Sequence, residues 1–456
     1  MPSFQSINPF TGKTIQKYPG DSPETVNQKL DRASNQFASW KKTTFSERAT
    51  LMSQAAKVLR DRKEDWAQIM TSEMGKPITE ARSEAEKCAW VCDYYAEHAE
   101  QFLEQELVET DADRSRVQYD PLGPVLAVMP WNFPFWQVFR FAAPGLMAGN
   151  VGLLKHASNV PGCALAIEEI FREAGFPDGV FQTILISARS VAPVIEDPRV
   201  KAVTLTGSEA AGRSVGETAG GALKKSVLEL GGSDPFIVLE DANIAEAAQV
   251  GATARCINSG QSCIAAKRFI VVESVLDEFV EKFTRAIKAL KVGDPMEEDT
   301  RVGPLARKDL REGLHEQVMQ SEKDGAEVVL GGAYLEREGY FYAPTVMTGV
   351  SKGMAVYEEE TFGPVAAIIT AESETDAIQI ANDTHFGLGA SLWTTNQDRA
   401  ERLSHEINAG CVFVNGLVKS DPRLPFGGIN DSGYGRELSY HGIREFVNTK
   451  TVWMKY

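Results

Sequence analysis

The feature that most constrains the fold is an alternation of short apolar segments with helical ones, beginning near Val125. The spacing predicts helices between the apolar segments, for example over 163–173. Five apolar segments fit buried strands: 125–129, 151–155, 181–186, 202–205 and 226–230. Strands that alternate with helices favour a parallel sheet covered on both faces, so we expect a doubly wound α/β unit.

A second series of the same kind follows the first. Helices are predicted over about 245–256 and 276–290. The segments that fit strands here are 235–239, 269–272, 366–369, 390–393 and 411–415. We therefore expect an α/β chain with two doubly wound parallel-sheet domains.

Three further regions lie outside these units. Residues 1–20 fit a hairpin, 22–102 fit helices, and both the polar segment 107–121 and the tail 446–456 fit strands. An exposed terminal strand tends to pair with another chain. We expect this β arm to join subunits of a homodimer or homotetramer.

The net charge and the cysteine content argue against several classes of function. The 456 residues carry a net charge of -16 with no basic block, which argues against nucleic acid as a partner. No signal peptide is evident, and no apolar run reaches the ~18 residues that span a bilayer. Six scattered cysteines indicate a reducing compartment, and without HxxxH or CxxC we expect no metal site. We expect a cytoplasmic protein that does not bind membranes.

The segment Asn258-Ser259-Gly260-Gln261-Ser262-Cys263 places a thiol in a flexible turn after a predicted helix. Small neighbours leave the sulfur accessible and backbone N–H groups close by. A nucleophile beside donors for an oxyanion is what thiol catalysis of acyl chemistry needs. A buried structural cysteine is the alternative interpretation.

Two polar residues lie at predicted strand ends. Glu229 ends an apolar strand before Gly231-Gly232, where a carboxylate is unfavourable unless it is used or paired, so it fits a general base. Asn132 follows the first strand and can donate an amide N–H to an oxyanion. A solvated glutamate and an Asx turn or helix cap are the alternatives.

Other residues are suited to binding a nucleotide. Lys155 ends the second strand, where it can bond ribose or phosphate, and the helix opening at Gly207-Ser208 suits a pyrophosphate. Glu360, beside Phe362, can clamp a ribose. No GxGxxG follows any strand, so the usual dinucleotide motif is missing. A surface lysine and plain turns are the alternatives.

Six motifs, in this order, resemble the aldehyde dehydrogenase superfamily from about Asn8 to Trp453. Within it the chain is most similar to bacterial succinate-semialdehyde dehydrogenases. The motifs are Pro130-Trp131-Asn132-Phe133-Pro134, Thr206-Gly207-Ser208, Leu228-Glu229-Leu230-Gly231-Gly232, Gly260-Gln261-Ser262-Cys263, Glu360-Thr361-Phe362-Gly363-Pro364, and Pro425-Phe426-Gly427-Gly428 with Ser432-Gly433-Tyr434-Gly435-Arg436-Glu437.

The resemblance implies a domain organisation and a reaction. A Rossmann-like cofactor domain would span 1–102 and 122–231, a catalytic domain 232–443, and the oligomerisation arm 103–121 and 444–456. The reaction would be NAD(P)-dependent oxidation of an aldehyde through a cysteine thiohemiacetal and a thioester, which water then hydrolyses.

The resemblance also implies roles for the site residues. Cys263 would be the nucleophile, Asn132 part of the oxyanion hole, and Glu229 the base that activates water. The implied cofactor-binding residues are Trp131, Asn132, Lys155, Ser158, Gly207, Ser208, Leu230, Glu360 and Phe362.

Position 158 bears on the choice of cofactor. NAD-preferring relatives carry a glutamate there, three residues after the lysine, and this chain carries Ser158. A carboxylate would repel a 2′-phosphate, whereas a hydroxyl can donate to it. We therefore expect a preference for NADP, with NAD still usable.

The predicted helix after Pro134 bears on the substrate. It carries Gln137 and Arg140 on one face, which the resemblance makes a wall of the substrate tunnel together with Trp136. A buried unpaired guanidinium is costly unless the substrate brings a carboxylate, and Ser420 can add a hydroxyl donor. We expect a short carboxy aldehyde, succinate semialdehyde first. An ion pair between Arg140 and a local acid is the alternative.

Other functions remain open at this point. The substrate could be another aldehyde, and coenzyme A or phosphate could resolve the thioester, although Glu229 favours water. A catalytically silent binding or structural protein on the same fold is the alternative of another class, against which Cys263, Glu229 and Asn132 argue.

Overall fold

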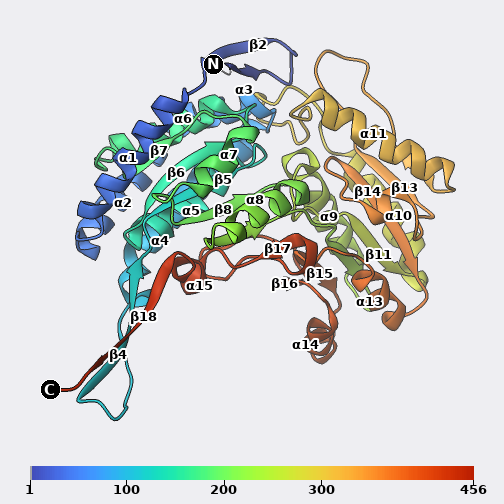
Figure 1. Ribbon diagram of the computed structural model, residues 1–456. Helices are drawn as coiled ribbons and strands as arrows, with labels where there is room; N and C mark the ends of the chain where they lie inside the picture. Colours follow the sequence, from blue (N-terminus) through green and yellow to red (C-terminus); the bar gives the residue numbers. More distant parts are fainter. Residues whose placement is uncertain (1–2) are drawn as a thin grey trace.

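The first predicted α/β unit forms a six-stranded sheet in the computed structural model, which describes residues 3–456 (Figure 1). Its strand order is β17-β9-β8-β5-β6-β7, parallel throughout except for β17. The chain runs outward from β5 to one side and then returns to β8 on the other, which leaves a crevice at their carboxyl ends. The strands are β5 (Pro124–Met129), β6 (Val151–His156), β7 (Phe181–Thr183), β8 (Ala202–Thr206), β9 (Lys225–Glu229) and β17 (Gly433–Tyr434).

The second unit forms a seven-stranded sheet in the order β12-β13-β14-β11-β10-β15-β16. Only β12 runs antiparallel to its neighbour. The strands are β10 (Pro235–Val238), β11 (Arg268–Val272), β12 (Glu327–Leu330), β13 (Thr345–Thr348), β14 (Val365–Ala371), β15 (Gly389–Trp393) and β16 (Cys411–Val414). The expected α/β fold with two doubly wound sheets is confirmed, although β12 and β13 were not predicted.

Helices cover both sheets. Around the first sheet lie α1 (Pro23–Trp40), α2 (Phe45–Asp61), α3 (Lys63–Met74), α4 (Ile78–Phe102), α5 (Trp136–Met147), α6 (Pro161–Glu173), α7 (Val191–Glu196), α8 (Glu209–Gly221) and α15 (Ser439–Arg444). Around the second lie α9 (Ile244–Cys256), α10 (Leu276–Lys288), α11 (Lys308–Lys323), α12 (Ala355–Glu358), α13 (Glu374–Asn382) and α14 (Gln397–Glu406).

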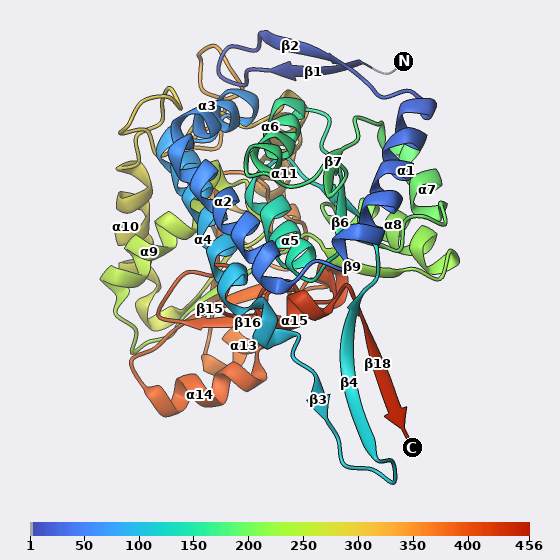
Figure 2. The same cartoon turned by 90° about the vertical axis from the view of Figure 1, so that its left-hand side faces the viewer.

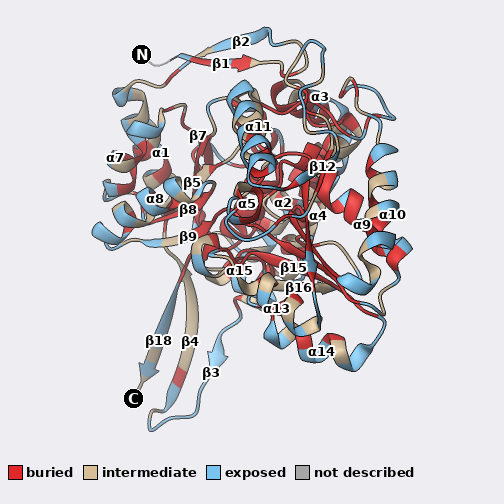
Figure 3. Ribbon diagram, turned by 90° about the vertical axis from the view of Figure 1, so that its right-hand side faces the viewer, coloured by how far each residue is buried: buried red, intermediate tan, exposed pale blue. Residues whose placement is uncertain are grey.

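The central strands are buried on both faces, which explains why they read as apolar runs rather than as alternating ones. Every residue of β6, β8 and β11 is buried (Figure 3). The third strand ends at Thr183 rather than at residue 186, because the Leu185 N–H donates to the Asp21 carboxylate instead of a neighbouring strand.

A narrow sheet extends away from the body (Figures 1 and 2). In it β18 (Val447–Met454) pairs antiparallel with β4 (Arg114–Pro121), and β3 (Glu106–Leu107) pairs with the other edge of β4. The expected N-terminal hairpin consists of β1 (Ser3–Ile7) and β2 (Thr14–Pro19); residues 1 and 2 lie outside the described part. None of the helices within residues 3–456 combines the length and apolar composition needed to cross a membrane.

Candidate active site

The residues of the cysteine turn (258–263) are held in an uncommon backbone conformation. Asn258 and Ser259 have φ values of 53° and 55°, in the left-handed region. The Asn258 N–H donates to the Glu80 carboxylate at 2.7 Å, and Asn258 Nδ2 donates to the Asn132 carbonyl oxygen at 2.7 Å. Burial raises the pKa of Glu80 to about 7. Contacts from two distant segments thus fix the turn, and Glu80 was not identified from the sequence.

Gly260 brings two of the sequence motifs into contact. Its φ is 77°, and a Cβ at this position would lie 2.3 Å from the carbonyl carbon and oxygen of Gly363. Nearby, the rings of Trp131 and Phe362 meet edge to face with centroids 5.7 Å apart. The turn therefore packs directly against the 360–364 motif, and only glycine fits at the contact.

Cys263 lines a cavity of ≈ 410 Å³, and Asn132 is hydrogen-bonded to the cysteine turn. Asn132 Nδ2 donates one hydrogen bond, to the Gln261 carbonyl oxygen at 3.2 Å, and an amide carries two such protons. The second N–H is therefore available to an oxyanion. Burial raises the pKa of the Cys263 thiol to about 12, against the effect of the nearby cations Lys267 and Arg140.

Glu229 lies at the end of β9 with 2% of its surface exposed. Neither carboxylate oxygen has a hydrogen-bond partner among residues 3–456. Burial, followed by repulsion from Glu437, raises the pKa of Glu229 well above its usual value. A Cβ at Gly427 would lie 2.7 Å from Glu229 Oε1, so glycine at 427 leaves room for this carboxylate. A buried unpaired carboxyl of this kind suits proton transfer.

Arg140 lines the cavity as expected, but its guanidinium is not unpaired. Its Nε forms an ion pair with Glu437, its guanidinium lies 4.8 Å from the Phe426 ring centroid, and Nη2 donates to Thr206 Oγ1 at 3.4 Å. The premise of an unpaired guanidinium is wrong, and the alternative of a local ion pair is confirmed. Glu437 lies far from Arg140 in sequence, so no local pattern could reveal the pairing.

One cation of the cavity wall that has no carboxylate partner among residues 3–456 is Lys87 of α4, which the sequence did not single out. Its Nζ donates to Ser420 Oγ at 2.9 Å and lies 4.2 Å from the Trp136 ring centroid. Trp136 Nε1 also donates to Ser420 Oγ, at 3.0 Å. Burial, followed by repulsion from Arg140, lowers the pKa of Lys87 to about 8. Lys87, Trp136, Gln137 and Ser420 all line the cavity that Cys263 opens into.

On the other side of Cys263, residues expected to bind a cofactor gather at the carboxyl ends of the first sheet. Lys155 is 8% exposed and has no ion-pair partner in the described chain, and burial lowers its pKa. Ser208 caps α8 by accepting from the Ala211 N–H at 3.4 Å, which leaves Gly207 at the strand-to-helix turn. Ser158 is exposed nearby in sequence.

The remaining two expected cofactor residues adjoin the cysteine turn. Glu360 Oε1 accepts from the Gly232 N–H at 3.1 Å, and a Cβ at Gly231 would lie 2.7 Å from Glu360 Oε2. Leu230, which precedes these glycines, is buried and packs against the helix residue Gly212. These positions fit a dinucleotide, because Lys155 near the end of β6 and the N-terminus of α8 after β8 both lie at the carboxyl edge of the first sheet, where such cofactors bind.

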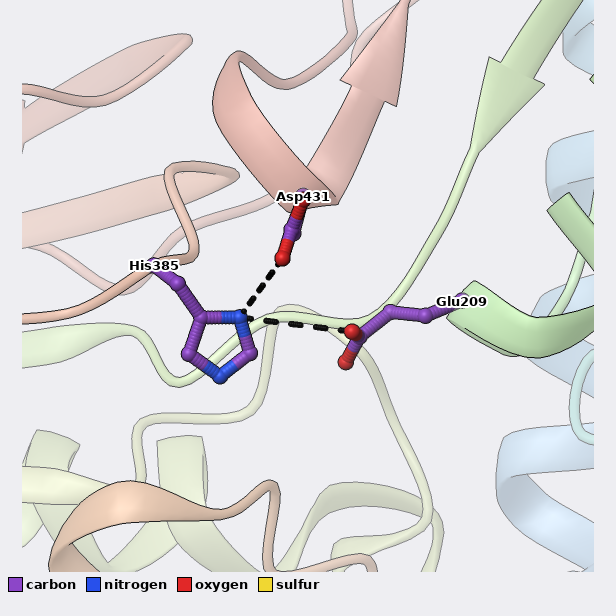
Figure 4. Close-up of side chains that lie close together, drawn as sticks. All are labelled: Glu209, His385 and Asp431. Atoms are coloured by element: carbon purple, nitrogen blue, oxygen red, sulfur yellow. Dashed lines mark hydrogen bonds and ion pairs between the residues drawn. The ribbon is translucent and has the colours of Figure 1, made fainter. Parts of the chain in front are cut away.

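A further polar cluster joins α8 to the second unit (Figure 4). His385 Nδ1 lies 3.0 Å from Asp431 Oδ2 and 4.0 Å from Glu209 Oε2. Asp431 also pairs with Arg213, whose Nη2 lies 2.8 Å from its Oδ1. Although the three side chains lie within reach of one metal ion, both carboxylates face the same imidazole nitrogen and a guanidinium competes for Asp431. We interpret the cluster as ion pairing.

Comparisons with known proteins show the family of the chain. The sequence pattern of the aldehyde dehydrogenase family matches residues 2–452, and the chain belongs to this family. It is 55% identical to a probable succinate-semialdehyde dehydrogenase (NADP(+)) of Synechocystis sp. over 99% of this chain and 100% of that protein. It is 51% identical to succinate-semialdehyde dehydrogenase (NADP(+)) 1 of Mycobacterium tuberculosis, over 98% of this chain and 99% of that protein.

The fold of the chain is closely similar to that of a solved structure. The succinic semialdehyde dehydrogenase from Streptococcus pyogenes, solved in complex with NADP+, superposes with a TM-score of 0.97 at 40% identity. The match covers 99% of this chain and 100% of that one.

The contact at Gly260 can be tested directly. We expect Gly260→Ala to destabilise the chain by about 2–5 kcal/mol, because alanine disfavours positive φ and its Cβ would overlap Gly363. Thermal unfolding measures this. Gly220→Ala, whose Cβ would meet nothing within 4 Å, is the matched control. Equal melting temperatures for both variants would contradict the packing described.

Proposed function

We propose that the protein oxidises a short carboxy aldehyde to the acid with NADP, and that the substrate is succinate semialdehyde. The observation that carries this proposal is one cavity that is lined both by Cys263 and by Lys87, a half-buried lysine that forms no ion pair among residues 3–456. The relatives named above support the same substrate and cofactor.

The proposed chemistry begins at the sulfur. The Cys263 thiolate attacks the aldehyde carbon, and the free N–H of Asn132 and the Cys263 backbone N–H stabilise the resulting oxyanion. The bound nicotinamide cofactor supplies the hydride acceptor. Loss of hydride from the thiohemiacetal carbon leaves a thioester on Cys263.

Hydrolysis of the thioester falls to Glu229. Its buried carboxylate takes a proton from water, the hydroxide adds to the acyl carbon, and the carbon–sulfur bond breaks to release acid and thiol. Because burial raises its pKa, Glu229 acts as a base only once it has lost its proton, so hydrolysis should speed up as pH rises through that pKa.

Replacing Glu229 by Gln tests this role. We expect Glu229→Gln to keep a burst of NADPH close to one per site while steady turnover falls by at least about 100-fold, since a general base contributes that much. Rapid-mixing absorbance separates the two phases, and Cys263→Ala should lose both. Wild-type turnover in Glu229→Gln would contradict the role, and wild-type turnover restored by coenzyme A would favour the acyl-transfer alternative.

The cationic end of the cavity is proposed to bind the substrate carboxylate. Ser420 Oγ already accepts two hydrogen bonds, from Lys87 and Trp136, so its own proton is free to donate. Lys87 has no carboxylate partner among residues 3–456, and a half-buried charge of this kind is stabilised by an anionic ligand. Arg140 makes a secondary contribution to binding the carboxylate, because it lines the same cavity while pairing with Glu437.

Lys87→Met should raise KM for succinate semialdehyde about tenfold or more, the size of a lost charged hydrogen bond. KM for butanal, a neutral aldehyde of equal chain length, should change less than about twofold. In the wild type, KM for the charged substrate should rise above pH 8, because Lys87 loses its proton through its pKa of about 8. Lys282→Met, on the exposed face of α10, is the control. Equal effects on both aldehydes would contradict carboxylate recognition by Lys87.

The NADP preference is proposed to rest on Ser158 together with Lys155. A hydroxyl at 158 can donate to a 2′-phosphate, and the unpaired ammonium of Lys155 suits the same anion.

Ser158→Glu should lower the NADP/NAD ratio of kcat/KM, because a carboxylate repels the phosphate and accepts from ribose hydroxyls. Steady-state kinetics with both cofactors measure the ratio, and Ser158→Ala is the control for loss of the hydroxyl alone. An unchanged ratio in Ser158→Glu would contradict the assignment.

We also propose the domain division and the assembly. The cofactor domain spans 1–102 and 122–231, the catalytic domain 232–443, and the arm 103–121 and 444–456. Exposed apolar residues on the arm, Leu107 at 73% and Trp453 at 48%, support its pairing with a second subunit in a homodimer or homotetramer. The free cysteines support a cytoplasmic location.

A further inference from the structure

Lys267 lies four residues after Cys263 and directly before β11, and its side chain is completely buried. An ammonium carries three N–H donors, and three acceptors surround this one. They are the Ser262 carbonyl oxygen at 3.0 Å, the Cys263 carbonyl oxygen at 2.7 Å and Glu360 Oε1 at 3.2 Å. All of its hydrogen-bonding capacity is therefore directed at the nucleophile's own main chain and at one carboxylate.

The backbone that carries Lys267 is itself fixed. Its N–H donates to the Asp234 carbonyl oxygen at 3.1 Å, and its carbonyl accepts from the Ala367 N–H at 3.1 Å. Lys267 is thus anchored between β10 and β14, so its Nζ can hold the cysteine turn in place.

We propose that Lys267 is a positioning residue that fixes the main chain at Cys263 and whose positive charge favours the thiolate form of that cysteine. This inference rests on the proposed role of Cys263 as the nucleophile. An arginine or lysine near a thiol is a general means of making it reactive.

The charged groups around Cys263 show how much Lys267 contributes to favouring the thiolate form. The near cations are Lys267 and Arg140, and the near acids are Glu360 and Asp234. Glu80, Glu84, Lys87 and Arg301 also line the cavity, and Cys411 lies close enough to Cys263 for the two thiols to interact. Among these groups Lys267 opposes the burial effect most strongly, so its removal would leave two acids against one cation.

The test uses the protein without cofactor and measures alkylation of Cys263 by iodoacetamide against pH, with the modified peptide identified by mass spectrometry. For Lys267→Met we expect the pH profile to move upward by about one unit, so that the rate at pH 8 falls about tenfold. Lys267→Gln keeps two N–H donors without the charge and should move the profile by a similar amount. Lys282→Met, a distant exposed lysine, should match the wild type.

A second variant covers the case in which loss of a buried lysine prevents folding. Glu360→Gln removes the acid that pairs with Lys267, and we expect the profile to move downward. Wild-type profiles in both folded Lys267 variants would overturn the inference, and so would an unchanged or raised profile in Glu360→Gln. A wild-type protein that alkylates another cysteine in place of Cys263 would instead contradict the proposed nucleophile.

Discussion

The site depends on the contact between the Gly260 backbone and the Gly363 carbonyl. It locks a left-handed turn against a segment about a hundred residues further along the chain, and a Cβ would come within 2.3 Å. Glu80 on α4 and Asn132 after β5 support the turn from the first unit. The nucleophile is therefore positioned by both α/β units together and by neither alone.

This arrangement gathers buried charge around one sulfur. Arg140 forms an ion pair with Glu437, whose charge also raises the pKa of Glu229, and Lys267 forms an ion pair with Glu360. Each ion would be costly in isolation, and most are compensated by a partner. Glu229 and Lys87 form no ion pair among residues 3–456, and the proposed function assigns to them a proton transfer and an anionic ligand.

Much of the fold could be predicted from the sequence, because buried parallel strands leave continuous apolar runs separated by helical periodicity. The short strand β12 left no such signal, since it lies at the sheet edge and is only partly buried. The strand β13 is buried but only four residues long. The motif residues that meet at the cysteine could be recognised because they lie at strand ends. The partners of the charged side chains could not be predicted, because Glu437 meets Arg140, and Lys87 meets Ser420, only once the chain has folded. For that reason the sequence assigns the substrate carboxylate to Arg140, whereas the structure pairs Arg140 with Glu437 and leaves Lys87 without an ion pair among the described residues.

The central claim is that substrate carbon becomes covalently attached to Cys263 during turnover. Acid quenching within the first turnover, followed by peptide mass spectrometry of the wild-type protein with NADP and succinate semialdehyde, tests it most directly. The account predicts an acyl group on the peptide that contains Cys263, in proportion to the NADPH formed. NADPH formation with no adduct there, or with the adduct on another cysteine, would contradict it.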